Sequence, residues 1–394
     1  MLPLSGLRVI AVEQYGAGPY GSMQLADLGA EVIKVENPAE DGDMARRVGP
    51  YFLENGDSQF FHSFNRNKKS ITLDLKKPAA GHVMAALAAR ADGVMDNLRG
   101  DLPEKLGLTY PALAPANPRI VCAHLSAYGR TGSRAHWPGY DYLMQAEAGY
   151  LSLTGEPDGP PARMGLSIVD LMTGLFAAFA LVSGVLEARM SGEGRDLDVS
   201  LFDCALQNLS YVATWYLNAG HMQSREPRSA HPSLVPSQLY RTRDGFIFIM
   251  CNKEKFWPIL CERVGHTEWA PDPRFRSFKD RLANRGLVNQ LLDEALSQRN
   301  TAEWLEHFAG LVPAAPVNDI RAALENPFVH EAGRVRQYHG EDVPAIRMVA
   351  GPVVTADETP CRAAPALGAD TDTVLRDCGF SVREIDELRA GHVI

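Results

Sequence analysis

Residues 8–36 read RVIAVEQYGAGPYGSMQLADLGAEVIKVE, and this stretch decides the fold. Its pattern predicts a buried strand over Arg8–Val12, a helix over Gly21–Gly29 and a second buried strand over Val32–Glu36. A strand, a glycine-rich turn, a helix and another apolar strand, in this order, are typical of an α/β protein with a parallel sheet.

The turn between the first strand and the helix, residues 16–21, matches the GxGxxG pattern, and Glu36 lies twenty residues after Gly16. In dinucleotide-binding proteins such a turn approaches a pyrophosphate and the acidic residue binds a ribose. A nicotinamide-dependent oxidoreductase is therefore one hypothesis. Against it, residues 13–15 separate the strand from the glycines, and Pro19 has no N–H to offer a phosphate. A glycine-rich turn for another nucleotide-like ligand is the alternative.

The same alternation of strands and helices continues to about residue 219. A helix is expected from about Pro78 to Ala91 and another over Leu201–Ala219. Further strands are predicted over Ser70–Leu75, Gly93–Asn97, Arg119–Ser126 and Arg195–Val199. The sequence therefore predicts a large α/β domain over 1–225.

A smaller α+β domain is predicted over 232–311, after a polar, proline-containing linker at His231–Gln238. It would contain a strand and three helices, over Gly245–Cys251, Lys255–Val264, Phe278–Ala295 and Thr301–Gly310. The segment 312–394 is expected to return to the large domain. We expect it to form short strands and a terminal amphipathic helix, over Gly333–Tyr338, Ile346–Val349, Pro352–Val354 and Ser381–Ala390.

Composition excludes several classes of function. The 394 residues carry a net charge of −9, and no basic stripe with interleaved aromatic residues is present, so no nucleic-acid partner is expected. The six cysteines are scattered without a CxxC pair, and no metal site is predicted. The N-terminus does not resemble a signal peptide, and the apolar run Leu171–Leu186 is too short for a confident membrane span. We therefore expect a cytoplasmic protein without a membrane partner.

Asp170 is the most informative single residue. It is the only charged residue between Arg163 and Glu187, and it precedes the apolar run, which predicts a buried helix with Asp170 at its start. A helix N-terminus stabilises a carboxylate that burial would otherwise disfavour. An ionised, partly desolvated carboxylate is a candidate nucleophile. The alternative is that Asp170 only caps its helix, as aspartate commonly does.

Two further segments hold candidate polar groups. The loop Asn65–Ser70 contains Arg66, Lys68 and Lys69, which could bind phosphates by charge-assisted hydrogen bonds, although a solvated basic loop is the simpler interpretation. His124 lies near the end of a predicted strand, where active-site groups of α/β proteins gather. We interpret it as a core histidine.

Taken together, these motifs resemble the family III CoA-transferases, which include formyl-CoA and carnitine CoA-transferases and the α-methylacyl-CoA racemases. The likeness runs through nearly the whole chain. Besides residues 4–36 and the Asp170 helix, it rests on NRNKKSITLDL (65–75), ADGVMDNLRGDLPEKLGL (91–108), LSAYGRTG (125–132), PGYDYLMQAEAGYLSLTG (138–155) and GEGRDLDVSLFD (192–203).

The resemblance implies a function and a set of site residues. The family's nucleophilic aspartate falls on Asp170. Its CoA-binding segments fall on Tyr15, Gly16, Ala17, Arg66, Lys68, Lys69, Asn97, Leu98, Lys105 and Tyr128. The family has a Rossmann-like large domain, uses acyl-CoA and a carboxylic acid without a metal or nicotinamide, and forms interlocked homodimers of two ring-like subunits. The small domain would close over the partner's active site.

Two departures bear on specificity. Tyr140 stands where the racemase branch has a catalytic histidine, so the two-base proton shuttle lacks one member and transfer is favoured over racemisation. The glycine-rich loop of some oxalate-specific members is absent from the sequence, and HPSLVPSQ (231–238) resembles members that use succinyl-CoA and dicarboxylic acids. Tyr140 and Arg163 are the candidate substrate-binding residues, although Arg163 could equally be a surface arginine. A racemase, an oxidoreductase and a non-enzymatic CoA-binding module remain the alternatives.

Overall fold

The computed structural model describes residues 1–341 and 343–394. The chain forms two compact units. The first unit comprises Met1–Ala148, Met164–Thr214 and His330–Ile394, and the second comprises Gly149–Arg163 and Trp215–Val329. The expected small domain, 232–311, lies within the second unit, which begins earlier and ends later in the sequence.

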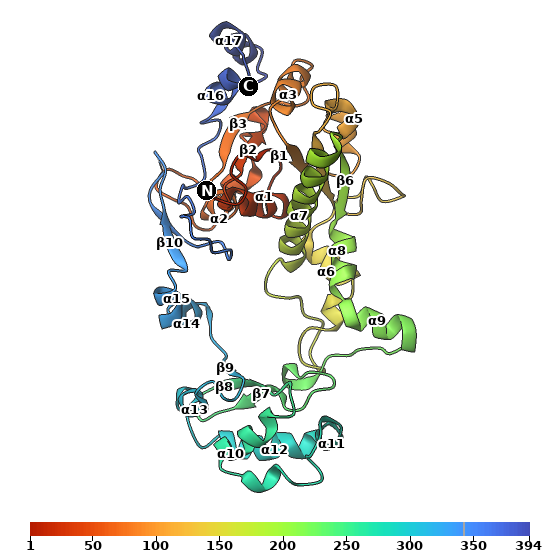
Figure 1. The fold of residues 1–394 in the computed structure, drawn as a ribbon, viewed down its shortest axis with the longest axis vertical. Coiled ribbons are helices and arrows are strands. Elements are labelled where there is room, and N and C mark those ends of the chain that lie inside the picture. The colour runs from red at the N-terminus through yellow and green to blue at the C-terminus, as the bar shows by residue number, and fades with distance from the viewer. Residues whose placement is uncertain (342) are drawn as a thin grey trace. The chain divides into compact units, whose positions relative to one another are not determined.

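The first unit is built on a six-stranded sheet of order β3-β2-β1-β4-β5-β6, in which every neighbouring pair is parallel (Figure 1). This confirms the predicted α/β class with a parallel sheet, and the six strands predicted for the large domain are present. Their bounds are β1 Arg8–Val12, β2 Glu31–Glu36, β3 Lys69–Thr72, β4 Gly93–Asp96, β5 Val121–Ser126 and β6 Arg195–Ser200. The strand order reverses between β1 and β4, which is where open α/β sheets bind ligands.

Helices cover both faces of this sheet. Alternate strand residues, among them Ile10, Ile33 and Val94, form one core with α3, α16 and α17, so the end of the chain completes this face. The opposite face packs against α7. The helices of this unit are α1 Ala17–Asp27, α2 Gln59–Asn65, α3 Ala80–Ala88, α4 Leu102–Lys105, α5 Tyr110–Leu113, α6 Asp141–Glu147, α7 Ile168–Ser191, α8 Leu201–Asn208, α16 Thr371–Asp377 and α17 Val382–Ala390.

Two glycines let α1 and α7 cross closely. A Cβ atom added at Gly21 would lie 2.2 Å from the carbonyl oxygen of Gly174, and one added at Gly174 would lie 2.2 Å from that of Ala17. Only glycine fits at both positions, since a Cβ atom does not approach a backbone oxygen this closely. The crossing brings the glycine-rich turn at the start of α1 against the first turn of α7.

The apolar helix, which the sequence predicts to be buried, is buried on one face and exposed on another. Phe179 and Leu186 of α7 are 71% and 62% exposed, while Ala177 and Leu181 face the sheet and are fully buried. By length and composition α7 could cross a membrane, a test that the core helix of a soluble protein also passes. Its packing against the strands accounts for its buried face.

Several predicted boundaries in the first unit need correction. The first helix begins at Ala17, so the glycine-rich turn forms its first turn. The helix expected over Leu201–Ala219 is two helices, α8 and α9 Ser210–Ala219, because Ser210 adopts a φ of 49°, and α9 spans the boundary between the units. β10 Val335–Tyr338 and β11 Ile346–Val349 form an antiparallel pair, whereas Pro352–Val354 is not a strand.

The second unit contains an antiparallel sheet of β7 Ser237–Arg241, β8 Phe246–Met250 and β9 Ala314–Pro316. The expected linker therefore includes the start of a strand. The helix predicted over Phe278–Ala295 is interrupted at Asn284. The helices are α10 Phe256–Val264, α11 Phe278–Ala283, α12 Arg285–Leu296, α13 Thr301–Phe308 and α14 Ile320–Leu324, and α15 Pro327–Glu331 spans the boundary between the units.

Candidate active site

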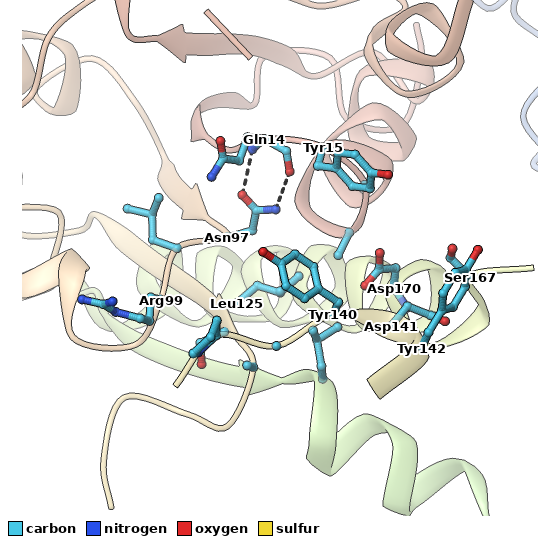
Figure 2. Close-up of a pocket in the computed structure, with 18 of the residues that line it drawn as sticks. Gln14, Tyr15, Asn97, Arg99, Leu125, Tyr140, Asp141, Tyr142, Ser167 and Asp170 are labelled. Carbon is cyan, nitrogen blue, oxygen red and sulfur yellow. Dashed lines mark hydrogen bonds between the residues drawn. The ribbon is translucent and has the colours of Figure 1, made fainter. Parts of the chain in front are cut away.

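A cavity of about 530 Å³ opens in the first unit at the carboxyl ends of the strands where the strand order reverses. The turn after β1 supplies Gln14–Ala17, the turn after β4 supplies Asn97–Arg99, and β5 ends there with Leu125–Ala127. The first turns of α6 and α7 complete the lining with Asp141 and Asp170. Figure 2 shows Asp170 in this cavity together with Tyr15 and Tyr140.

Asp170 lies in the first turn of α7, three residues after the N-cap residue Ser167. Two helix N-termini meet at its side chain, because Gly16 is the N-cap of α1 and a Cβ atom added there would lie 3.1 Å from Asp170 Oδ2. Helix N-termini carry unpaired N–H groups and the positive end of the helix dipole. The site is thus suited to a carboxylate and to oxyanions that form beside it.

The ionisation of Asp170 differs from the expectation that the helix start would hold its charge. Burial and, secondarily, the neighbouring charge of Asp141 raise the pKa of Asp170 to about 7. The backbone N–H of Asp170 donates to Asp141 Oδ2 at 3.0 Å, so this helix-start donor brings a second carboxylate close to the first. A carboxylate of raised pKa is more basic than an ordinary aspartate when it loses its proton.

Paired amides fix the turn that begins the cavity. The backbone N–H of Gln14 donates to Asn97 Oδ1 at 2.8 Å, and Asn97 Nδ2 donates to the Gln14 carbonyl at 2.7 Å (Figure 2). The next residue, Tyr15, has a φ of 68°, and its N–H donates to Asp43 Oδ1 at 3.0 Å. These bonds hold the first and the fourth strand ends together at the edge of the cavity.

Six residues predicted for the site therefore lie together with Asp170: Tyr15, Gly16, Ala17, Asn97, Leu98 and Tyr140. Tyr140 is 67% exposed, so its ring is accessible. The cavity is also lined by residues that were not predicted for the site: Gln14, Met44, Arg99, Trp137, Asp141 and Tyr142. Asp141 and Tyr142 directly follow Tyr140, so proximity to it was the one available signal.

The basic loop does not line the cavity. Arg66 and Lys68 are buried and ion-paired with Asp27 and Glu13, each at 2.7 Å, which contradicts the interpretation as a solvated loop. Burial lowers the pKa of Lys68 to about 8 despite its carboxylate partner. Lys69 pairs with a carboxylate of β2 at 2.6 Å. In this conformation all three cations are engaged within the protein.

The remaining predicted residues also lie outside the cavity lining. Lys105 donates to Asp101 at 2.6 Å, and the Tyr128 hydroxyl donates to Glu147 at 2.7 Å. Arg163 belongs to the second unit. Roles for these three side chains in binding CoA or substrate stay predictions.

His124 is a satisfied core histidine, as expected. Its Nδ1 lies 2.6 Å from Asp96 Oδ2 and its Nε2 lies 3.0 Å from Asp196 Oδ1. These carboxylates outweigh burial and raise the pKa of His124 to about 9. A histidine held as a cation between two carboxylates has no free ring nitrogen for catalysis.

Glu36, the acidic residue that would bind a ribose in a dinucleotide-binding site, is engaged within the protein. Both carboxylate oxygens of Glu36 accept bonds inside the protein, from Arg46 at 2.7 and 2.8 Å, from Ser70 at 2.6 Å and from the N–H of Asp43 at 3.0 Å. These partners overcome burial and lower the pKa of Glu36 to about 2. Glu36 is therefore not available to a ribose, and the glycine-rich turn faces Asp170 instead.

The cavity thus holds a buried carboxylate at two helix N-termini, and comparison with known proteins defines the class. The sequence model of CoA-transferase family III matches residues 4–371, and the chain belongs to this family. The protein is accordingly a CoA-transferase, an enzyme class that uses acyl-CoA substrates.

Individual relatives support the assignment. The chain is 35% identical over 384 residues to a succinate–glutarate CoA-transferase of Agrobacterium fabrum, with 95% of each chain covered. It is 34% identical to a succinyl-CoA:glutarate CoA-transferase of Mus musculus, over 96% of this chain and 86% of that protein. A CAIB/BAIF family protein from Brucella suis has a similar solved structure, with a TM-score of 0.82, 32% identity, and 96% and 99% of the two chains covered.

Proposed function

We propose that this enzyme moves CoA from succinyl-CoA to a short dicarboxylic acid such as glutarate, through covalent intermediates on Asp170. The observation that carries the proposal is the Asp170 carboxylate in the cavity, in contact with the glycine-rich turn. The named activities of the relatives supply the substrate class.

The proposed reaction proceeds by successive acyl transfers. Asp170 attacks the thioester carbonyl carbon, the C–S bond breaks, and the electron pair leaves on sulfur as the CoA thiolate. The thiolate then attacks the aspartyl carbonyl of this mixed anhydride, which releases succinate and forms an aspartyl-CoA thioester. Covalent catalysis of this kind divides one difficult exchange into easier steps.

The second half repeats these steps in reverse order. The acceptor carboxylate attacks the carbonyl carbon of the aspartyl thioester, the C–S bond breaks, and the CoA thiolate leaves. The acceptor is then joined to Asp170 in a second mixed anhydride. The thiolate attacks the acceptor acyl carbon, which yields the new acyl-CoA and restores the Asp170 carboxylate. No proton is gained or lost overall, and unpaired N–H groups at the starts of α1 and α7 would stabilise the oxyanions.

The cavity lining suggests how substrate binds. CoA would lie along Tyr15, Gly16 and Ala17 and along Asn97 and Leu98, because these residues line the same cavity as the nucleophile. The mechanism requires neither a metal nor nicotinamide. Among the other residues implied by the family, Tyr128 and Lys105 are proposed to contact CoA. Tyr140, which lines the cavity, is proposed to contact the acid substrate. The three cations of the basic loop, Arg66, Lys68 and Lys69, would reach CoA only by leaving their present partners.

We further propose that the enzyme is an interlocked homodimer in the cytoplasm, as the family resemblance implies. The exposed apolar residues of α7, including Leu175, Phe179 and Leu186, are suited to a protein partner, since such patches commonly mark interfaces. Sedimentation at micromolar concentration should give the mass of two chains.

Intact-protein mass spectrometry after incubation with succinyl-CoA tests the covalent step. A CoA-sized, hydroxylamine-sensitive adduct is expected on the wild type and not on Asp170→Asn. The matched control is Asp203→Asn, because Asp203 also lies in the first turn of a helix but does not line the cavity. An adduct on Asp170→Asn, or none on the wild type, would overturn the proposal.

The racemase alternative is separated by a second measurement. A racemase exchanges the α-hydrogen of a 2-methylacyl-CoA for deuterium from heavy water without any acid acceptor. The proposed transferase should form new acyl-CoA only when a carboxylic acid is added and should leave the α-hydrogen in place.

A further inference from the structure

A second buried carboxylate lies directly behind the nucleophile. Asp141, the first residue of α6, is 4% exposed, and its Oδ2 accepts the backbone N–H of Asp170 at 3.0 Å. Its Oδ1 accepts Gln145 Nε2 at 2.6 Å. Gln145 is itself fixed, since its Nε2 also donates to the Leu166 carbonyl at 3.1 Å and its Oε1 accepts the Met164 N–H at 2.9 Å.

The donors to Asp141 are neutral. Throughout residues 1–341 and 343–394, no lysine, arginine or histidine forms an ion pair with it. A buried carboxylate that is hydrogen-bonded only by amides keeps most of its negative charge unbalanced. That charge therefore acts on the neighbouring carboxylate, Asp170.

Several other ionisable groups on the elements packed against α7 are hydrogen-bonded to partners other than Asp141 and Asp170. Asp96, His124 and Asp196 bind one another on β4, β5 and β6, and Asp203 of α8 bonds to Ser200. The full set of titratable and charged residues on the elements packed against α7 and around the cavity is Tyr20 and Asp27 of α1, Asp96 of β4, Cys122 and His124 of β5, Asp141, Tyr142 and Glu147 of α6, Arg195, Asp196 and Asp198 of β6, Asp203 and Cys204 of α8, and Tyr15, Arg99 and Tyr140 at the cavity.

We propose that Asp141 is a positioning residue that fixes the first turn of α7 through its main-chain hydrogen bond and, by its charge, sets the pH above which Asp170 attacks the thioester. The inference rests on the proposed function of Asp170. Burial and the Asp141 charge are the causes of the raised pKa of Asp170, burial being the larger.

The charge also favours the chemical step. When Asp170 attacks the thioester carbonyl carbon and the C–S bond breaks, the negative charge moves from the carboxylate to the departing sulfur. The repulsion between Asp141 and ionised Asp170 is present before the attack and absent in the neutral anhydride. An interaction that destabilises only the starting carboxylate lowers the barrier to its acylation. Asp141 thus promotes the first acyl transfer without touching the reacting atoms.

The pH dependence of kcat/KM for succinyl-CoA tests this role in wild type and Asp141→Asn. The asparagine oxygen can still accept the Asp170 N–H, so the substitution removes the charge and keeps this bond, although it loses the one from Gln145 Nε2. We expect the acid limb of Asp141→Asn to move down by about one pH unit, the scale of one like charge beside a partly desolvated carboxylate. The limiting kcat should fall severalfold, since a less basic nucleophile reacts more slowly.

Asp203→Asn is the matched control, because it removes a carboxylate from a neighbouring helix without changing the cavity lining, and its acid limb should match the wild type. If Asp141→Asn does not fold, Asp141→Ser offers a smaller neutral acceptor. An acid limb in a folded neutral variant that coincides with the wild type would refute the charge role and leave Asp141 as a helix cap.

Difference infrared titration gives a readout independent of activity. The protonated carboxyl band that Asp170→Asn removes should disappear near pH 7 in the wild type and at lower pH in Asp141→Asn. If no covalent adduct forms but this shift is present, the proposed function fails while the coupling of the two carboxylates stands. If the adduct forms and the band titrates at the same pH in both proteins, the coupling is wrong and the function stands.

Discussion

Replacing Asp170 by asparagine should stabilise the protein, and the stabilisation should grow with pH. The pKa of Asp170 is raised from 3.8 to about 7 in the folded protein, so the folded state binds this proton more tightly than the unfolded chain. Its contribution to stability is fully present below pH 3.8 and is lost as the pH rises through 7. Linkage between these two values makes Asp170→Asn more stable by about 4 kcal/mol at pH 8 and about 2 kcal/mol at pH 5.

Urea unfolding at 25 °C, followed by tryptophan fluorescence at pH 5, 6, 7 and 8, measures this difference. The quantity to compare is the free energy of unfolding of Asp170→Asn minus that of the wild type. Ser167→Ala is the control, because it changes the N-cap residue of the same helix without changing any charge, and its effect should be the same at every pH. A difference for Asp170→Asn that is constant or shrinks as the pH rises would refute the reasoning.

Three further substitutions test other parts of the structure. Gly174→Ala places a Cβ atom 2.2 Å from a backbone oxygen and should lower the free energy of unfolding in urea by about 2–3 kcal/mol, whereas Gly286→Ala, with no atom within 4 Å, should not lower it. Lys68→Met leaves the Glu13 carboxylate buried without its cation and should cost about 3–5 kcal/mol in the same assay. Asn97→Ala removes both amide bonds to the first turn and should raise KM for acyl-CoA more than it lowers kcat.

The strands of the large sheet could be predicted from sequence because each is a short apolar run or alternates apolar with polar residues, as β6 does. Errors fell where local pattern carries no information on tertiary packing. The exposed side of α7 is as apolar as its buried side, so no periodicity separates Phe179 from Leu181. The interruption between α8 and α9 depends on the φ angle of Ser210, and the neighbouring residue types do not predict that angle.

The candidate site likewise contains residues that could be predicted from the sequence and residues that could not. Asp170 and the turn Tyr15–Ala17 could be predicted because an isolated charge before an apolar run and a glycine cluster are both visible in the sequence. The burial of Lys68 could not, because its partner Glu13 lies 55 positions away and only the folded sheet brings the two together. The role proposed for Asp141 could not be predicted either, because it depends on the hydrogen bond from the Asp170 backbone, which only the structure shows.

The return of the chain to the first unit has a consequence for biosynthesis. Ile385 and Val393 of the C-terminal segment belong to the same core as Ile10 of the first strand, and the Asp74 N–H donates to the Val393 carbonyl at 2.8 Å. A ribosome therefore exposes the edge of this core long before it delivers the residues that cover it. Nascent chains should depend on chaperones during that interval, and chains that lack α16 and α17 should be degraded rather than form a shortened enzyme.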